Sequence, residues 1–349
     1  MSVLTQKQIA DRLGVSQSLV SQILNGKRTV SSKLHRRIVQ EGERLGYQPN
    51  HSAQALRTGR RRSWGILVPD FSFLADFNRQ IVQGLSEVAS ANDHAVSIAC
   101  LSGPRAEEED YLKVVRGGRF DGVFLIYEGR ASRPPFERIV RLGAMPVVIN
   151  CPLGDEAVPH VCSDGEGGVY EAVRHLIDVH GRRRIAFVNR CRESWVMEDR
   201  YRGYERALLD AGLAVDDALV EPMVEGLSYE GHGERAVRRL VETGVEFDAI
   251  YCAADYIAMG VLAGLHDHGI AVPQRVAVVG FDNFHLTACT RPRLTTVACD
   301  GIAMGRRAGR MMLEILDGGH ERVARSVRLP VSLVVRESCG CGKAGVSDS

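Results

Sequence analysis

The chain has 349 residues, 45% of them apolar and 25% charged, which is typical of a folded protein of two or three domains. It has no run of ~18 apolar residues and no secretory leader pattern, so we expect a cytoplasmic protein with no membrane partner. The nine cysteines are scattered and odd in number, which favours buried thiols over a disulfide framework.

The net charge of +1 hides an asymmetry between the two parts of the chain. The first 62 residues hold twelve Lys and Arg against three Asp and Glu, whereas the remainder holds 32 against 40. A small basic segment on a mildly acidic body is typical of nucleic-acid binding. A solubilising basic tail is the alternative interpretation.

The basic segment has the periodicity and the caps of short helices. A first helix is predicted to begin at Gln6, capped by Thr5, and to end at Gly14. A second helix is predicted to be capped by Ser16 and to end at Asn25.

A third helix is predicted to follow Ser31 or Ser32 and to end before Gly46. Two short helices joined by a glycine turn and braced by a third form a helix-turn-helix module. A helical bundle that serves only to dock another protein is the alternative.

In a helix-turn-helix module the second helix enters the major groove, and its first polar residues meet the base edges. Here these residues are Gln17, Ser18 and Gln22, and the amide of Gln22 suits an adenine. Ser16 and Ser21 are placed for phosphate oxygens, although helix capping is the simpler role for Ser16.

The residues Ile9 to Asn25, together with 47–50 and 53–56, resemble the signature and the hinge of the LacI/GalR family of transcription regulators in both sequence and spacing. Two positions depart from the family pattern. Leu19 stands where the family usually has Thr, which removes an expected phosphate contact. Gln22 stands where it usually has Arg, which changes the operator sequence to be expected.

The resemblance implies DNA contacts from the headpiece and from a hinge at 49–62. Two hinge segments would fold side by side on the operator, where Leu56 of each would wedge into the minor groove and kink the duplex. A flexible linker is the alternative. The residues expected to contact DNA are Thr5, Gln6, Ser16, Gln17, Ser18, Ser21, Gln22, Asn25, Thr29, Ser31, Asn50, Gln54, Leu56 and Arg57.

From Trp64 onward, short apolar runs alternate with amphipathic helical stripes, which predicts parallel sheets covered by helices on both faces. A strand-poor break near 151–164 divides the pattern into two subdomains. The expected strands are 65–68, 95–101, 122–126, 146–149, 185–188, 249–252 and 276–279.

The fold class we expect has two parts. An all-α, lambda-repressor-like helix-turn-helix headpiece precedes an α/β effector domain of two doubly wound parallel-sheet subdomains, and this domain resembles periplasmic sugar-binding proteins. The expected boundaries are headpiece 1–48, hinge 49–62, effector domain 63–340 (N-subdomain 63–161 and 291–325, C-subdomain 162–290 and 326–340) and tail 341–349.

In such sheets ligands lie outside the carboxyl ends of the strands, here between the two subdomains. Asp282 and Asn150 each follow a predicted strand, and Arg200 matches the cleft arginine of the family. A structural ion pair between Asp282 and Arg200, and ordinary packing for the aromatic residues, are the alternatives. Ala254 replaces a usual Asn, which makes a standard hexose less expected. The expected effector-binding residues are Phe71, Phe73, Tyr127, Asn150, Trp195, Arg200, Asp255 and Asp282.

No enzyme and no cofactor are expected. The glycine-rich residues 164–168 lack the spacing and the lysine of a phosphate-binding loop, and no catalytic constellation is visible. Cys339-Gly-Cys341 could hold a metal ion, but the sequence places no second Cys/His pair at ligand spacing, so no metal site is expected.

Together these patterns predict a DNA-binding transcriptional regulator, a repressor. It would bind pseudo-palindromic double-stranded DNA of the nucleoid as a homodimer, under allosteric control by a small sugar-like effector. The tail has no leucine heptads, so a tetramerisation helix is not expected. The alternative function is a solute-binding receptor of the periplasmic type without a DNA role.

Overall fold

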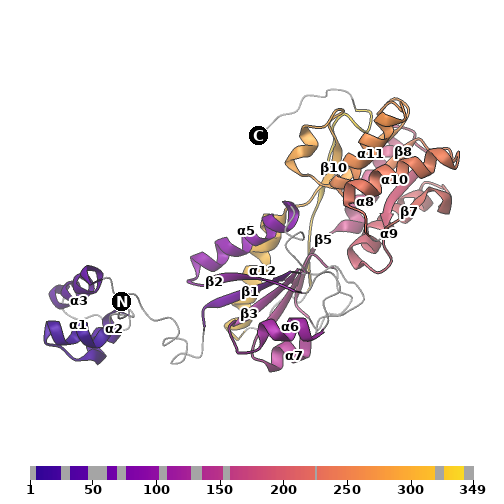
Figure 1. Cartoon of the computed structure of the whole chain (residues 1–349). Helices are drawn as coiled ribbons and strands as arrows, with labels where there is room; N and C mark the ends of the chain where they lie inside the picture. Colours follow the sequence, from indigo (N-terminus) through magenta and orange to yellow (C-terminus); the bar gives the residue numbers. More distant parts are fainter. Residues whose placement is uncertain are drawn as a thin grey trace. The chain divides into compact units, whose positions relative to one another are not determined.

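The computed structural model describes residues 5–24, 32–45, 61–68, 76–101, 108–126, 136–151, 158–224, 226–318 and 326–341 (Figure 1). The chain divides into two compact units, Met1–Arg62 and Ser63–Ser349. In these described ranges, every helix is too short or too polar to cross a membrane.

The first unit contains the three predicted helices. The Thr5 side chain accepts a hydrogen bond from the backbone of Gln8, whose side chain accepts one from the Thr5 backbone, so the first helix begins with a capping box. Gly14 ends this helix at φ 65° and ψ 34°, a left-handed conformation that glycine adopts without steric cost. The helices are α1 (Gln6–Leu13), α2 (Gln17–Leu24) and α3 (Ser32–Arg44).

Among the described residues of this unit, the core is small and its buried side chains are apolar. Ser16 Oγ accepts a hydrogen bond from Leu19 N at 3.2 Å. This contact confirms the prediction that Ser16 caps the second helix. The buried side chains come from one face of each helix: Ile9, Ala10, Val20, Ile23 and Ile38.

The first sheet of the second unit is entirely parallel and has the strand order β11-β5-β4-β3-β1-β2. Two apolar clusters cover its opposite faces: Ile66 and Val68 face the cluster that includes α5 and α12, and Leu67 faces the one that includes α6 and α7. The strands are β1 (Ser63–Val68), β2 (Ala95–Cys100), β3 (Gly122–Ile126), β4 (Met145–Ile149), β5 (His160–Ser163) and β11 (Ser326–Leu329). The helices are α5 (Asp76–Ala91), α6 (Glu108–Val115), α7 (Phe136–Arg141) and α12 (Gly301–Leu316).

The second sheet has the order β12-β10-β9-β8-β6-β7 and is parallel except for the pair β10–β12. The helices pack in two pairs, α8 with α9 and α10 with α11 (Figure 1). The strands are β6 (Ile185–Arg190), β7 (Val220–Pro222), β8 (Ala249–Cys252), β9 (Ala277–Asp282), β10 (Thr295–Ala298) and β12 (Ser332–Val334). The helices are α8 (Gly165–Asp178), α9 (Trp195–Asp210), α10 (Tyr229–Glu242) and α11 (Asp255–Asp267), with short 3-10 turns η2 (Asp217–Leu219) and η3 (His285–Ala288).

The chain passes between the two sheets three times, which corrects the predicted subdomain boundaries. Strand β10 was expected in the N-subdomain but pairs with β9 in the second sheet. Strand β11 was expected in the C-subdomain but pairs with β5 in the first sheet. The predicted strand-poor break also contains β5. These strands have only four residues each, and their sequences do not indicate which of the two similar sheets they join.

Candidate functional site

The polar face of α2 is the first candidate site. Gln17 and Ser18 are exposed on its first turn, and Gln22 is half-buried one turn further on. The buried Val20 and Ile23 fix the opposite face to the headpiece core. The side chains predicted to meet base edges therefore lie on one helix whose orientation is set by packing.

Leu19, the first departure from the family pattern, is half-buried and packs against the headpiece core. Its side chain adds apolar contact where a threonine would offer a hydroxyl. Seven predicted DNA-contact residues and three predicted effector contacts lie outside the described residues: Asn25, Thr29, Ser31, Asn50, Gln54, Leu56, Arg57, Phe71, Phe73 and Tyr127.

A second group of polar residues gathers at the carboxyl ends of the strands. Asn150 follows β4 with φ 64°, Asn189 lies near the end of β6 with φ 79°, and Asp282 ends β9 with φ 113°. These left-handed conformations are costly for residues other than glycine and concentrate at ligand-binding sites. Their position matches the place where open α/β sheets bind ligands.

Arg200 of α9 is held at the end of the second sheet by three contacts. One guanidinium nitrogen donates to the carbonyl oxygen of Ala253, and another lies 3.4 Å from Asp282 Oδ1. The guanidinium carbon lies 3.7 Å from the ring centre of Phe281. Only 4% of Arg200 and 7% of Asp282 is exposed, so the two side chains form a buried ion pair.

Several buried polar atoms beside this ion pair have no hydrogen-bond partner among the described residues. They are both side-chain polar atoms of Asn189, the Nε of Arg200 and the hydroxyl of Tyr251. Asn189 and Tyr251 lie on adjacent paired strands, and Ala253 N donates to Val188 O at 3.1 Å. We call Asn189, Arg200, Tyr251 and Asp282 the carboxyl-end cluster. Because unpaired buried polar atoms are costly, such a cluster is suited to a polar ligand.

The predicted ligand contact Asp255 is instead fully buried and supports the chain beside the cluster. Its two carboxyl oxygens accept hydrogen bonds from Thr296 Oγ1 at 2.6 Å and from Phe284 N at 3.0 Å. Burial, followed by the negative charge of Asp282, raises the pKa of Asp255 to about 8. In this structure both carboxyl oxygens are thus engaged within the protein.

The other expected contacts differ in exposure. Trp195, at the start of α9, is 36% exposed, whereas Asn150 is 6% exposed. Asn189 and Tyr251 were not among the contacts expected from the sequence. Asn189 directly follows the predicted strand 185–188 and could have been found by the reasoning that selected Asn150, but the buried hydroxyl of Tyr251 gives no signal in sequence.

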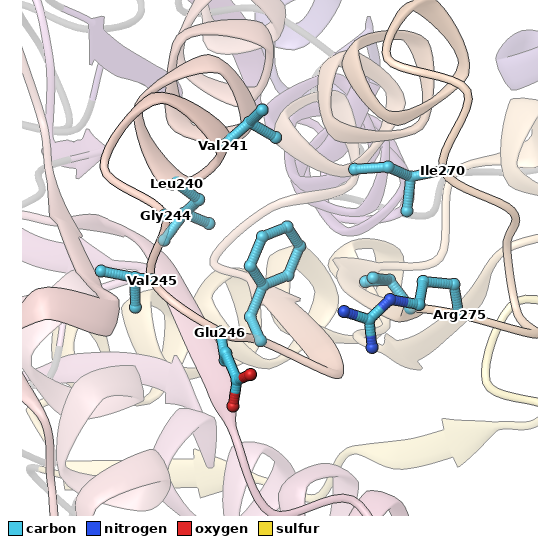
Figure 2. A pocket seen from close by; sticks show the side chains of 9 residues that line it. Leu240, Val241, Gly244, Val245, Glu246, Ile270 and Arg275 are labelled. Atoms are coloured by element: carbon cyan, nitrogen blue, oxygen red, sulfur yellow. The ribbon is translucent and has the colours of Figure 1, made fainter.

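A surface pocket of about 160 Å³ lies elsewhere, between the end of α10 and the segments that lead into β8 and β9 (Figure 2). Phe247 and Val276 line it, and both precede their strands. The pocket is thus at the amino ends of the strands, away from the edge where Asp282 lies. We therefore assign no ligand role to it.

The expectation that no Cys/His pair accompanies Cys339 and Cys341 is wrong. The fold brings His175 and His180 to these cysteines, with the four potential ligand atoms within 4.8 Å of one another. His175 and His180, with four residues between them, are at ligand spacing, but more than 150 residues separate them from the cysteines, so the sequence did not indicate that the two pairs meet.

Comparison with known proteins agrees with this architecture. A helix-turn-helix family matches residues 4–39, and the periplasmic binding protein-like domain family matches residues 173–339. The transcriptional regulator RegA of Clostridium saccharobutylicum is 32% identical over 89% of this chain and 92% of its own length. Catabolite control protein A of Priestia megaterium is 29% identical over 95% of this chain and 97% of its own.

Two solved structures share the fold over nearly the whole chain. The complex of the regulator CelR with cellobiose has a TM-score of 0.71 and 28% identity, and covers 96% of this chain and 99% of its own. The lac repressor dimer bound to operator has a TM-score of 0.84 at 21% identity, covering 97% and 99%.

A helix-turn-helix headpiece joined to a periplasmic-binding-type domain defines a class of transcription regulators that carry their own ligand-binding domain. The chain belongs to the LacI/GalR family of this class and is a DNA-binding transcriptional regulator. The match to its relatives includes the headpiece, so a solute receptor without a DNA role is not favoured.

Proposed function

We propose that this regulator is a cytoplasmic repressor that binds a pseudo-palindromic operator of the nucleoid as a homodimer, and that a small sugar-like effector sets its affinity for DNA. The observation that carries the proposal is the carboxyl-end cluster. Its buried, unpaired polar atoms lie in the domain that follows the DNA-binding headpiece.

The chemistry of this cluster suits a ligand with several hydroxyl groups. The Asp282 carboxylate accepts hydrogen bonds from hydroxyls, the Arg200 Nε–H donates one, and the Asn189 amide can do both. The exposed Trp195 offers an aromatic face to the apolar side of a sugar ring. The relative that was solved with cellobiose supports the same ligand class.

Other parts of the site follow from the family rather than from the described residues. We propose that Phe71, Phe73 and Tyr127 complete the effector site from the first subdomain, together with Asn150. We propose that Asp255 holds the segment after β9 in place and does not touch the effector.

For the DNA side, we propose that the expected contacts from Thr5 to Arg57 form the operator interface and that the hinge folds on the operator centre. Replacing Leu56 by Ala should weaken specific binding and leave non-specific binding little changed, because a wedge in the minor groove contributes only where the duplex is kinked. Equal losses on both DNAs would favour a flexible linker.

The effector site is tested by a thermal-shift screen of sugars and sugar acids on the full-length protein. A ligand of the site stabilises the folded state by mass action, so it should raise the unfolding temperature of the wild type. Asp282→Ala should abolish the shift. Asp267→Ala, which removes an exposed carboxylate on α11, should keep it.

A ligand that shifts all three proteins equally would bind elsewhere and contradict the assignment. We also propose that the protein binds its effector without transforming it. Recovery of a chemically altered ligand after incubation with the pure protein would overturn this.

A further inference from the structure

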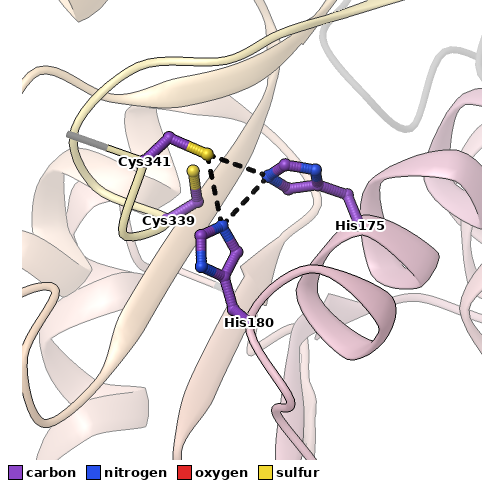
Figure 3. A group of neighbouring side chains, drawn as sticks. All are labelled: His175, His180, Cys339 and Cys341. Atoms are coloured by element: carbon purple, nitrogen blue, oxygen red, sulfur yellow. Dashed lines mark hydrogen bonds between the residues drawn. The ribbon is translucent and has the colours of Figure 1, made fainter. Parts of the chain in front are cut away.

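The cluster of His175, His180, Cys339 and Cys341 joins two separate segments of the second subdomain. His175 lies in the last turn of α8, and His180 follows two residues after the end of that helix. Cys339 and Cys341 lie in the turn that follows β12 (Figure 3). All four side chains point toward a common centre.

The distances among three of the donor atoms, those of His175, His180 and Cys341, match the edges of a metal-centred tetrahedron. Zinc bonds of about 2.3 Å to sulfur and about 2.0–2.1 Å to nitrogen give edges of about 3.3 Å between two nitrogens and about 3.6 Å between nitrogen and sulfur. The two His Nε2 atoms are 3.3 Å apart. Cys341 Sγ lies 3.3 Å from His180 Nε2 and 3.7 Å from His175 Nε2. A cation bonded to these three atoms would therefore need little movement of their side chains, and Cys339 Sγ lies within 4.8 Å of each of them.

The turn that carries the cysteines is fixed before any metal binds. Ser338 Oγ accepts a hydrogen bond from Thr295 N at 2.8 Å and donates one to Val278 O at 2.6 Å. Gly340, between the two cysteines, has φ 111°, and a Cβ at this position would lie 3.0 Å from His180 Nδ1. The glycine therefore permits both the backbone conformation and the close approach of the imidazole.

Hydrogen bonds among the imidazole nitrogens and the sulfur would pair these atoms less completely than a bound cation would. Two imidazole nitrogens and a sulfur form a triangle, and any proton within it can bridge only one of the three close pairs. A cation at the centre satisfies all the donors at once. A donor set of two nitrogens and two sulfurs favours Zn²⁺, and a set with four protein ligands is typical of a structural site.

We propose that His175, His180, Cys339 and Cys341 bind one Zn²⁺ ion per chain as a closed structural site. The ion joins the end of α8 to the turn after β12. This turn follows the connection that leads from β11 in the first sheet to β12 in the second. Because the ligands come from segments far apart in sequence, binding stabilises the folded domain more than the unfolded chain.

The proposal is tested on tag-free, full-length protein dialysed against buffered nanomolar free Zn²⁺. The wild type should retain about one zinc per chain, since one four-ligand site is proposed. Cys341→Ser and His180→Gln should lose nearly all of it. The matched controls Cys289→Ser and His266→Gln, which change exposed residues outside the cluster, should retain it.

A second measurement uses only the wild-type protein, so it does not depend on whether the variants fold. Wild-type protein stripped with a chelator and titrated with Co²⁺ should give the intense visible bands of tetrahedral coordination and a thiolate charge-transfer band, and Zn²⁺ should raise its unfolding temperature by several degrees. Weak six-coordinate bands, no retained metal, or equal zinc in site variants and controls would overturn the proposal. Binding only at a large excess of metal would mark an adventitious ion.

Discussion

At the end of the second sheet, the Asp255 carboxyl is buried beside a second carboxylate, Asp282. Its pKa in the folded protein lies above the ordinary value, so the folded state binds the proton more tightly than the unfolded chain. The stabilisation from this proton is fully present below the ordinary pKa of about 4 and is lost as the pH rises through the folded-state pKa of about 8.

Replacing Asp255 by Asn should therefore remove the part of the pH dependence of the free energy of unfolding that comes from this carboxyl group. An Asn amide can still accept from Phe284 N and donate to the Thr296 hydroxyl. Between about pH 5 and about pH 8, the free energy of unfolding of the wild type should fall relative to the variant by at least about 1.4 kcal/mol, the equivalent of one pKa unit. Denaturant unfolding measures the difference, and parallel pH profiles would refute the assignment.

Gln22 on α2 stands where the family usually has Arg, and we propose that its side chain reads a base. Replacing it by Ala should remove about 1–3 kcal/mol of discrimination between the operator and single-base variants of it. Competition binding with a set of such operators measures this loss. Gln40→Ala, which changes an exposed glutamine on α3, should keep the discrimination, and an equal loss in both variants would contradict the base-reading role.

The candidate residues could be predicted from sequence where they follow a recognisable strand or match a helix-turn-helix position. Asp282 and Asn150 were found in this way, and Asn189 could have been. The role of Asp255 could not, because its neighbours Thr296 and Phe284 come from a later part of the chain. The cluster of two histidines and two cysteines was missed for the same reason.

Helices α5 and α12 pack together through glycines. A Cβ on Gly305 would lie 2.1 Å from the carbonyl oxygen of Ile81, and one on Gly84 would lie 2.2 Å from that of Ile302. Since backbone cannot yield as a flexible side chain can, any larger residue must push the two helices apart. This pair covers one face of the first sheet, so the separation would disturb the core beneath.

Gly305→Ala should accordingly lower the free energy of unfolding by about 1–3 kcal/mol, the usual cost of overpacking. Gly42→Ala is the control, because this helical glycine has its nearest neighbour at 3.6 Å and alanine favours a helix. The control should leave stability unchanged or raise it. Equal stability of Gly305→Ala and wild type in chemical unfolding would contradict the close packing.

The longer strands were predicted well because each is a short, continuous apolar run between two segments with helical periodicity. All seven expected strands are present as β1 to β4, β6, β8 and β9. The short strands β5, β7, β10, β11 and β12 were not predicted. They have three or four residues, and several carry polar side chains, so their pairing is decided by tertiary contacts and not by local pattern.

The two subdomains are connected by three chain segments and by contacts that cross between them. The hydroxyl of Tyr256 on α11 donates to Asp76 Oδ2 on α5 at 3.0 Å. Arg328 on β11 donates to the buried carboxylate of Asp199 on α9 at 3.2 Å. Contacts of this kind can differ between two arrangements of the subdomains, and an effector acts by preferring one of them.

The central claim is that the effector site and the DNA-binding headpiece are thermodynamically linked. The claim is tested by measuring operator affinity with and without effector, and effector affinity with and without operator, at one fixed salt concentration. Our account predicts that the two ratios are equal, with a coupling of about 1–3 kcal/mol. If the effector binds with its full affinity while both ratios equal one, the two sites are independent and the account is wrong.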